Sequence, residues 1–444
     1  LFSIADKIGF SFNPNRDKTR QPLRVEANQF ESYGRYVHRD QQTLLFGRLH
    51  IDPQNSMSFE EQGPNETFET ARLSSLPIQN AARRSAGGAF VSMQVAASLE
   101  KGILIPIRKE QRERFKSANQ MLAADNGGVI FKPPTGLYAN VAELDFVSMY
   151  PNIMANWNIS AETVGAVGSS TSFAPGIDVP IDQDETGIVA GILKPILKKR
   201  NAAKELLEDS QIKEHDPDYL KIAYGFLKGL GWVSYGYQGF SGNRIGSIEA
   251  HEAINAISRE VILQAKEVAE AHDFEVLHIY VDSLFASIGP HGRRMGRVLK
   301  RIQARTSLPI DLEGVYRWIA FLPSKQNAKV PVPNCFYGMF ETGDLKLRGV
   351  MARKKDTPEY IAHVQVEAIK LLGAEPEFHK LRSHIPKLVY YFKYHYDRIR
   401  LNEVPVKAML ISQTLSRDLE DFKVATPANT TARQMQRDGK AIGA

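Results

Sequence analysis

The pattern of apolar and polar positions predicts ordered elements in the first third of the chain. Residues 91–102, VSMQVAASLEKG, are typical of a helix that stops at a glycine. The apolar run ILIPI at 103–107 suits a short strand, and VAELDFVSMYP at 141–151 is a strand-like run closed by its proline. Residues 1–70 are polar and irregular, and they contain two short apolar pieces, 44–46 and 49–51, that suit strands.

The middle of the chain predicts a pair of helices. Pro195 suits a first helical turn, so one helix should run over 195–213. HDPD at 215–218 turns the chain, and 219–237 returns as a second helix. The preceding residues, 165–187, are rich in Gly, Ser, Pro and Asp, which indicates a loop.

A third helix and a hairpin follow. Apolar residues spaced three and four apart predict an amphipathic helix over 248–271. FEVLHIYV and LFASI then predict a β-hairpin with Asp282 and Ser283 at its tip. The last 100 or so residues are mostly helical in pattern.

Composition narrows the class of protein only a little. The 444 residues are enough for two to four domains, and 43% hydrophobic with 24% charged residues is ordinary for a globular protein. A net charge of +6 is compatible with a nucleic-acid partner, although many proteins without one are mildly basic. The single cysteine, Cys335, excludes a disulfide within the chain and a zinc site built on several cysteines.

The sequence also bears on location. No apolar run reaches the ~18 residues that span a bilayer, so we expect a cytoplasmic protein, nucleoid-associated in a prokaryote, with no membrane partner. The chain begins at Leu1 instead of Met, and we expect both ends to be cut from a longer protein.

Two acids interrupt strongly β-like runs, namely Asp145 and Asp282. A lone carboxylate inside a strand costs several kcal/mol of desolvation unless it is paired or bound to a metal. The alternative is that each acid lies at a strand end and faces solvent.

The residues around these two acids, and a third segment between them, resemble known sequence motifs. DFVSMYP at 145–151 is similar to motif A of the family B (alpha-like) DNA polymerases, D-x-x-S-[LM]-Y-P. KGLGWVSYG at 228–236 resembles their motif B, K-x-x-x-N-S-x-Y-G, and YVDSLF at 280–285 resembles motif C, Y-G-D-T-D-S-[LV]-F. Residues 72–94 and 102–109 resemble the segment before motif A, and LSRDLEDFK at 415–423 resembles part of the thumb. The short motif C and altered motif B look most like a divergent archaeal branch.

The resemblance implies an α+β fold shaped like a right hand. Its palm is an antiparallel sheet with helices, its fingers are helical and its thumb is mainly helical. The implied divisions are an exonuclease-like remnant at 1–90, palm at 91–186, fingers at 187–245, palm again at 246–345 and an incomplete thumb at 346–444.

The resemblance also implies the chemistry. Asp145 and Asp282, with the carbonyl of Phe146, would hold two Mg²⁺ ions, with Mn²⁺ as a substitute, for attack of a primer 3′-OH on an α-phosphate. The implied partners are primer–template DNA, deoxynucleoside triphosphates and a sliding clamp or other replication and repair proteins.

Cations for the triphosphate are implied on the finger helices. Arg200 and Lys204 are four residues apart and share one helix face, and Lys228 of motif B would join them. Backbone amides near Ser148 and Met149 would cradle the β- and γ-phosphates. Without the resemblance, the same cations would suit a solvated helix face.

The resemblance implies that residues of motifs A and B select the sugar and the base of the incoming nucleotide. Tyr150 matches the family's steric gate, which leaves no room for a 2′-OH, and the alternative is a core tyrosine. Lys228, Trp232 and Tyr235 lie at i, i+4 and i+7, so they share a face that should contact the nucleotide and the templating base. Gly236 would permit close approach of the base pair.

A basic segment, KLRGVMARKK at 346–355, begins the implied thumb. Its phosphate-binding residues would be Arg348, Arg353, Lys354 and Lys355. The alternative is a solvated connection between a strand and a helix.

Three departures qualify the resemblance. Trp232 stands where the family has Asn, and motif C has one Asp where the family has two. Asp282 aligns with the second of these, and the first is either deleted with a shortened turn or replaced. Near residues 60–75 the family's Tyr-x-x-x-Asp exonuclease motif corresponds to Phe68 and Arg72, and a cation there would repel a metal. We therefore expect no proofreading.

Three functions remain open from the sequence. The first is a template-directed DNA polymerase acting by two-metal phosphoryl transfer. The second is an inactive, polymerase-derived DNA-binding or scaffold protein, which the altered motifs B and C motivate. The third is an unrelated metal-dependent enzyme of nucleic acids, such as a nuclease.

Overall fold

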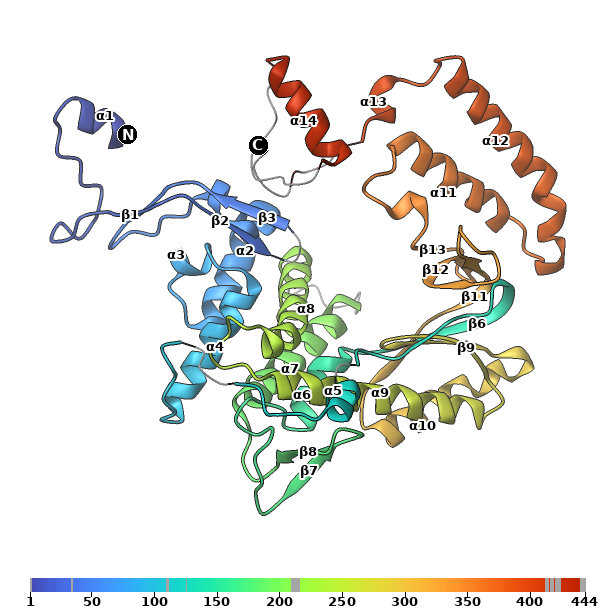
Figure 1. The fold of residues 1–444 in the computed structure, drawn as a ribbon, viewed down its shortest axis with the longest axis horizontal. Coiled ribbons are helices and arrows are strands. Elements are labelled where there is room, and N and C mark those ends of the chain that lie inside the picture. Colours follow the sequence, from blue (N-terminus) through green and yellow to red (C-terminus); the bar gives the residue numbers. More distant parts are fainter. Residues whose placement is uncertain are drawn as a thin grey trace. The chain divides into compact units, whose positions relative to one another are not determined.

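The computed structural model describes residues 2–32, 35–108, 112–124, 126–208, 216–411, 415, 419 and 425–439. They form two compact units that the chain visits in turn (Figure 1). One unit combines most of the chain up to Gly128 with Val147–Val261, and the other combines Val129–Phe146 with the residues from Ile262 onward. Within these described ranges no helix is long and apolar enough to cross a membrane.

The second unit is organised by an antiparallel seven-stranded sheet. Its order is β13-β12-β11-β6-β10-β9-β5. The central strands are β6 (Gly136–Phe146), β10 (Ser283–Ser287) and β11 (Ile310–Pro323), and the outer ones are β5 (Ile130–Phe131), β9 (Glu275–Tyr280), β12 (Pro331–Phe340) and β13 (Leu345–Arg348). The two longest strands, β6 and β11, pair along most of their length, from Phe146 opposite Ile310 to Gly136 opposite Phe321.

Large side chains fill both faces of this sheet, because successive residues of a strand point to opposite sides. One cluster is aromatic and includes Phe285, Tyr316, Phe321 and Phe336. The other places Trp318 and Met339 against Ile369 and Leu381.

Helices of the second unit follow the sheet in sequence. Helix α10 (Met295–Thr306) contacts β11, and α11 (Glu359–Gly373) runs beside α12 (Ile385–Arg400), as Figure 1 shows. Between them lies the short 3₁₀ helix η4 (Phe378–His384). The remaining elements of this unit are η2 (Gly289–Arg294), η3 (Met351–Arg353), α13 (Val406–Met409) and α14 (Pro427–Arg437).

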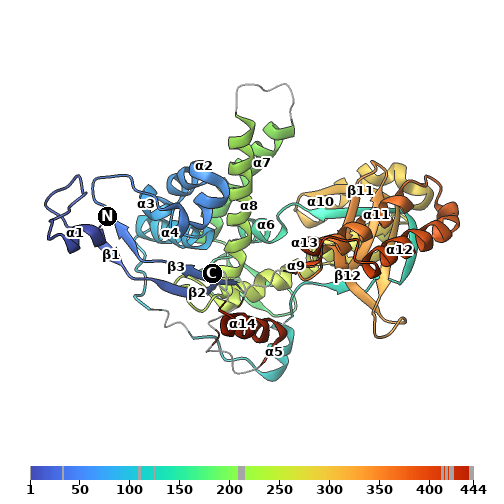
Figure 2. The ribbon, with the colours of Figure 1, turned by 90° about the horizontal axis from the view of Figure 1, so that it is seen from above.

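The first unit is mainly helical. Its long helices are α2 (Met57–Ser74), α4 (Ala86–Glu100), α7 (Ile188–Glu208) and α8 (Pro217–Gly239), and α9 (Ile248–Glu270) begins in it. In Figure 2, α7 and α8 run side by side and project beyond the other helices of their unit. The smaller elements are α1 (Phe2–Lys7), η1 (Pro53–Asn55), α3 (Ile78–Ala81), α5 (Ala118–Ala124), α6 (Met149–Asn156) and the hairpin β7 (Thr171–Ala174) with β8 (Val179–Asp182). Near the N-terminus β1 (Leu23–Val25) pairs with β4 (Gln42–Leu44), and β2 (Asn28–Ser32) pairs with β3 (Arg35–Arg39).

The start of α7 is capped by residues from another segment. The Asn158 side chain accepts from Gly187 N–H at 2.8 Å and donates to the carbonyls of Asp182 and Glu185, both at 2.8 Å. The buried Ser160 hydroxyl accepts from Val189 N–H at 2.9 Å. These contacts satisfy amide groups that a helix start leaves without partners, so α7 begins at Ile188.

Several sequence predictions are confirmed. The α+β class is correct. Helices occur where 91–102, 219–237 and 248–271 predicted them, and the hairpin around Asp282 is present as β9 and β10. The final part of the chain is mostly helical. The divisions into palm, fingers and thumb remain predictions.

Other predictions were wrong, mainly because tertiary contacts override local signals. Pro195 lies inside α7, since the caps described above start that helix seven residues earlier. The run at 141–151 leaves the strand after Phe146, and its proline lies within α6. Residues 103–107 and 49–51 form no strand, and of 44–46 only Leu44 belongs to one. The predicted loop at 165–187 contains the hairpin β7–β8.

Two predicted features lie outside the described residues. The end of the helix predicted over 195–213 falls there from residue 209 onward, as does the first residue of the 215–218 turn. Most of the thumb-like segment 415–423 also falls there.

Asn158 offers a test of the capping account. It has a left-handed φ of 56°, which Asn tolerates better than Ala. We expect Asn158→Gly to lower the free energy of unfolding by about 2–3 kcal/mol through lost hydrogen bonds. Asn158→Ala should cost roughly 1 kcal/mol more, because a Cβ is strained at positive φ. Urea unfolding of both variants measures the two losses, and equal losses would contradict the backbone contribution.

Candidate active site

The two acids singled out in the sequence meet on the sheet of the second unit. Asp145 is the last residue but one of β6, and its register partner on β10 is Ser283, which directly follows Asp282. The Ser283 hydroxyl donates to Asp145 Oδ1 at 2.5 Å, and the Phe146 N–H donates to the Asp282 carbonyl at 3.1 Å. Strand pairing therefore brings together residues that are 137 positions apart in the sequence.

The electrostatics of this pair are unfavourable without a counter-ion. Burial and the neighbouring Asp145 carboxylate raise the pKa of Asp282 to about 6. Both effects disfavour the charged form of a carboxyl group. A bound cation would reverse the balance, because it stabilises the two ionised groups.

The donor set fits a hard divalent cation. It offers carboxylate oxygens and the adjacent Phe146 backbone, and Mg²⁺ prefers oxygen ligands while retaining several waters. Among the described residues, no group of three or more His, Cys, Asp and Glu side chains is assembled around an ion site. The protein would thus supply part of the shell, and water and substrate oxygens would supply the rest.

The turn between β9 and β10 bears on the first motif C acid, which this chain lacks. Tyr280 pairs with Ser283, so only Val281 and Asp282 form the turn. The motif C pattern has four residues between its Tyr and its Ser, so a two-residue turn favours deletion of the first acid over its replacement. Val281 has a φ of 61°, as two-residue hairpin turns require at their first position. A β-branched residue is strained there, so the turn stores strain beside Asp282.

Two further acids lie near the pair in sequence or register. Asp311 on β11 is the register partner of Asp145 on the side opposite β10. Glu143 is buried, accepts from the Tyr316 hydroxyl at 2.7 Å and from Lys346 at 2.8 Å, and burial raises its pKa. Glu143 is therefore engaged within the protein. Lys346, the first cation of the basic segment, forms an ion pair with Glu143.

In the first unit, Tyr150 belongs to a stack of three rings. Its ring lies 4.3 Å from that of Tyr235, at an interplanar angle of 8°, and Tyr235 lies 4.5 Å from the ring of His251. The Tyr235 hydroxyl donates to Asn255 at 2.9 Å. Residues of α8 and α9 thus position the Tyr150 ring, and its role in sugar selection remains a prediction beside the alternative of a packing tyrosine.

Tyr150 enters this stack at the start of α6. Ser148, the residue before that helix, has a left-handed φ of 48°, and Met149 is the first helical residue and is buried. Helix α8 approaches α6 closely at Gly231, where a Cβ would lie 3.1 Å from Pro151. A larger residue at 231 would separate the two helices that carry motifs A and B.

The motif B face of α8 is largely solvent-exposed. The Lys228 ammonium lies 5.3 Å from the ring centroid of Trp232, whose side chain is 68% exposed. Tyr235 and Gly236, about one turn after Trp232 on α8, are half-buried. The predicted common face of Lys228, Trp232 and Tyr235 agrees with the helix, and its predicted contacts with nucleotide and template remain predictions.

Arg200 is the most unusual cation of the finger helices. It is buried, its Nη2 donates to the Tyr224 hydroxyl at 3.2 Å, and its guanidinium lies over the Tyr224 ring at 5.2 Å. Within the described part of the chain its Nε and Nη1 have no hydrogen-bond partner. Buried charged donors without partners are costly, and an anion would satisfy them. Lys204, one turn on, lies 3.8 Å from Glu208.

The basic segment of the second unit faces solvent. Arg348 ends β13, and Arg353, Lys354 and Lys355 follow around η3, all four exposed. These side chains are accessible to a polyanion, and exposure also fits a solvated connection, so their contact with phosphates remains a prediction.

Sequence reasoning missed several residues of these sites. His251 and Asn255 sit one turn apart in the 248–271 helix, where only the apolar positions had been considered. Asp311 and Tyr224 are brought near the site residues by strand register and helix packing. No local signal in the sequence marks any of them, apart from the i, i+4 spacing of His251 and Asn255.

Comparison with known proteins gives a consistent result. The family described as DNA polymerase family B matches residues 77–443. "DNA polymerase 2" of Aeropyrum pernix is 24% identical over 406 residues, covering 89% of this chain and 47% of the relative. "DNA polymerase" of Pyrococcus glycovorans is 26% identical over 388 residues, covering 84% and 47%. The chain spans less than half the length of these relatives.

A solved structure shares the fold. The family B DNA polymerase from the hyperthermophilic archaeon Pyrobaculum calidifontis matches with a TM-score of 0.61 and 24% identity. The match covers 87% of this chain and 47% of that structure.

The electrostatic account of the acid pair predicts a stability effect. Because the pKa of Asp282 is raised in the folded state, its ionisation removes stability as the pH rises through about 6. A rise of this size corresponds to about 3 kcal/mol, and partial exposure reduces it. In EDTA at pH 7.5, Asp282→Asn should therefore be more stable than the parent by roughly 1–3 kcal/mol.

Thermal unfolding at pH 5 and 7.5, with and without Mg²⁺, checks this prediction. The advantage of the variant should shrink at pH 5, and Mg²⁺ should stabilise the parent more than the variant. The control is Asp356→Asn, an exposed acid of the same unit. A variant less stable than the parent in EDTA at pH 7.5 would contradict the account.

Proposed function

Because the chain belongs to DNA polymerase family B, we propose that it extends a primer 3′-OH along a DNA template by phosphoryl transfer. The observation that carries the proposal is the partly buried pair of Asp145 and Asp282. Strand pairing holds two like charges together there, at a cost that a divalent cation would offset.

The acid pair and the Phe146 carbonyl would hold the cations in this proposal. When bound, the cations supply electrostatic stabilisation of the attacking and leaving oxygens. The protein's own contribution is to fix both carboxylates through the β6–β10 register and the hydrogen bond from Ser283. Magnesium is the expected ion, and manganese can replace it.

The incoming deoxynucleoside triphosphate would be bound by the finger helices. The unpartnered Nε–H and Nη1–H of Arg200 suit a phosphate oxygen, since guanidinium donors match phosphate geometry. Lys204 and Lys228 would add charge, and the amides of Ser148 and Met149 would add neutral donors. This assignment is supported by the buried, unsatisfied state of Arg200.

Tyr150 would select the sugar, and its ring stack supports that role. The Tyr150 ring stacks on Tyr235, which in turn stacks on His251, and these contacts would restrict its movement. The motif B face with Trp232 and Gly236 would contact the nascent base pair. An indole in place of the family's Asn changes the shape of that surface.

The remaining assignments follow the family. The exposed cations Arg348, Arg353, Lys354 and Lys355 would contact DNA phosphates, which position a duplex without reading its sequence. The region before residue 91 would be a structural flank without proofreading. Its Arg72 donates to the buried Glu69, so these two residues pair with each other.

Loss of either carboxylate tests the reaction. We expect Asp145→Asn and Asp282→Asn each to slow primer extension by at least about 10³-fold, because stabilisation of the transferring phosphoryl group is lost. DNA binding should be retained. Extension is measured with purified protein, primer–template, Mg²⁺ and all four triphosphates, and Asp356→Asn is the control.

The same assay separates the alternatives. A parent protein that binds primer–template without extending it would support the inactive scaffold, and metal-dependent degradation would support a nuclease. Full activity of Asp282→Asn would contradict the alignment of motif C.

Sugar selection is tested at the ring stack. We expect Tyr150→Ala to raise ribonucleotide relative to deoxynucleotide incorporation by roughly 10- to 100-fold, equivalent to about 1.4–2.7 kcal/mol of activation free energy. Tyr150→Phe keeps the ring and should keep the discrimination. His251→Ala should relax it partially, by loosening Tyr235. Single-nucleotide incorporation kinetics measure these ratios, and unchanged discrimination in Tyr150→Ala would show that another group excludes the 2′-OH.

A further inference from the structure

One basic part of the chain is a short, mainly helical segment to which none of the proposed catalytic residues belongs. Residues 378–407 contain seven Lys and Arg residues and two acidic residues, a balance of +5 beside +6 for the whole chain. Most of these cations lie on or next to α12. This segment therefore carries a clear excess of positive charge.

Helix α12 also exposes an unusual number of aromatic rings. The face of α12 toward α11 is in contact with that helix. There the Tyr360 hydroxyl of α11 lies 2.7 Å from His395 Nδ1, and Tyr391 is half-buried beside His395. On the outer faces, the side chains of Tyr390 and Tyr394 are 74% and 51% exposed. No residue of α12 is fully buried, so these rings do not serve a hydrophobic core.

Cations and rings alternate along one line of the helix. Lys387, Tyr390, Tyr394 and Arg398 follow one another at three- and four-residue spacing, which places them on one face. The line extends over about 16 Å at 1.5 Å per residue. The Arg398 guanidinium lies 5.9 Å from the Tyr394 ring centroid, and Lys393 and Arg400 flank the line.

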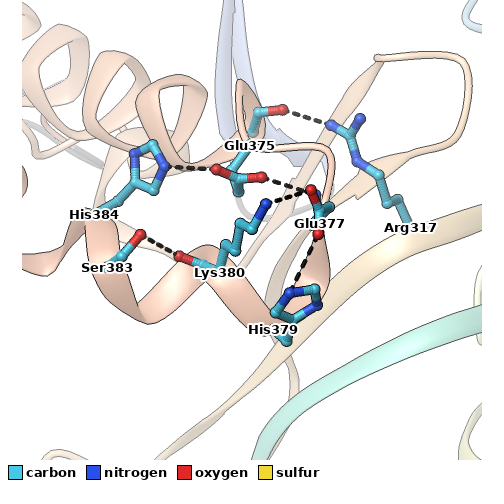
Figure 3. A network of polar contacts seen from close by, with 8 residues as sticks. Arg317, Glu375, Glu377, His379, Lys380, Ser383 and His384 are labelled. Atoms are coloured by element: carbon cyan, nitrogen blue, oxygen red, sulfur yellow. Dashed lines mark hydrogen bonds and ion pairs between the residues drawn. The ribbon is translucent and has the colours of Figure 1, made fainter.

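The acids near α12 do not neutralise this line. Figure 3 shows Glu375 accepting from His384, and Glu377 contacting Lys380 and His379. This network fixes the turn into α12, whose first residue follows His384. Among the described residues, no acidic side chain pairs with Lys387, Lys393 or Arg400. Arg398 alone of the line has an acidic partner, Glu403 at 3.5 Å.

We propose that this outer face of α12 binds single-stranded nucleic acid. Unpaired bases would stack on Tyr390 and Tyr394, and the phosphates between them would meet Lys387, Lys393 and Arg398. Alternation of rings and cations is the pattern that single strands require, because every base has a face to stack and every linkage a charge. A duplex hides its base faces and would use the cations alone.

The inference goes beyond the polymerase proposal, because it concerns binding by residues that take no part in the reaction. It can be tested without catalysis. The probe is a fluorescein-labelled oligo(dT) of about 20 nucleotides, a length that covers several stacking sites, and its affinity is measured by anisotropy. The same length of oligo(rU) tells whether the surface accepts DNA, RNA or both, and binding of either supports the proposal.

The informative variant is Tyr390→Ala with Tyr394→Ala. We expect it to bind oligo(dT) about tenfold more weakly or worse, because stacking on two rings is lost. The matched control, Tyr390→Phe with Tyr394→Phe, keeps both rings and should bind like the parent. Because both side chains are exposed, circular dichroism and thermal unfolding should be unchanged in either variant.

A second variant isolates the cations. Lys387→Gln with Lys393→Gln should reduce the slope of log affinity against log salt by about 1.4, at roughly 0.7 per phosphate contact on a single strand. The alanine pair should leave this slope and the affinity for a blunt duplex unchanged.

Three results would overturn the proposal. Unchanged oligo(dT) affinity in the alanine pair would exclude stacking on these rings. An equal loss of affinity for single strand and duplex in the alanine pair would show that the face contacts phosphates without stacking on bases. A parent that dimerises in sedimentation while the alanine pair stays monomeric, with equal oligonucleotide affinity, would assign the face to a second copy of the chain.

Discussion

The pairing of β6 with β10 is the constraint on which the candidate active site depends. It joins residues 137 positions apart, and its register sets Asp145 opposite Ser283 and beside Asp282. A slip of one residue would turn Asp145 to the other face of the sheet. The apolar partners Leu144 and Leu284, both fully buried, make such a slip costly. The core therefore fixes the distance between two carboxylates that would otherwise repel each other.

Two buried charged groups of this protein, Glu143 and Arg200, differ in whether the fold supplies their hydrogen-bond partners. Glu143 is surrounded by donors, from Tyr316 and Lys346, so it behaves as part of the fold. Arg200 is equally buried, yet within the described residues two of its nitrogens have no partner. A fold gains nothing from the second arrangement, because unsatisfied buried donors cost free energy. An anionic ligand would satisfy both nitrogens, and this contrast supports the proposed phosphate binding more strongly than the presence of cations on α7.

Much of this could be predicted from the sequence, and the failures have a common cause. Periodicity predicted α8, α9 and the β9–β10 hairpin because their apolar positions match their own geometry. It failed at Pro195, since Asn158 and Ser160 from another segment start α7 earlier. In the site, motif letters identified Asp145, Asp282 and Tyr150. The ring of His251, by contrast, enters the stack only through the packing of α8 on α9, which no local pattern contains.

The shortened motif C turn has an electrostatic consequence. The motif C pattern that this segment resembles has two acids, whereas here Val281 and Asp282 alone connect the strands and supply one. One fewer carboxylate means less repulsion to overcome when Asp282 ionises beside Asp145. The same turn holds Val281 at a φ of 61°, which is a strained conformation for a β-branched residue. Strain of this kind persists only where the surrounding structure imposes it, and here the β9–β10 and β6–β10 ladders impose it on the residue next to Asp282. The two ladders thus hold Asp282 in a fixed place beside Asp145, and in the proposed reaction such preorganisation would favour electrostatic stabilisation of the transition state.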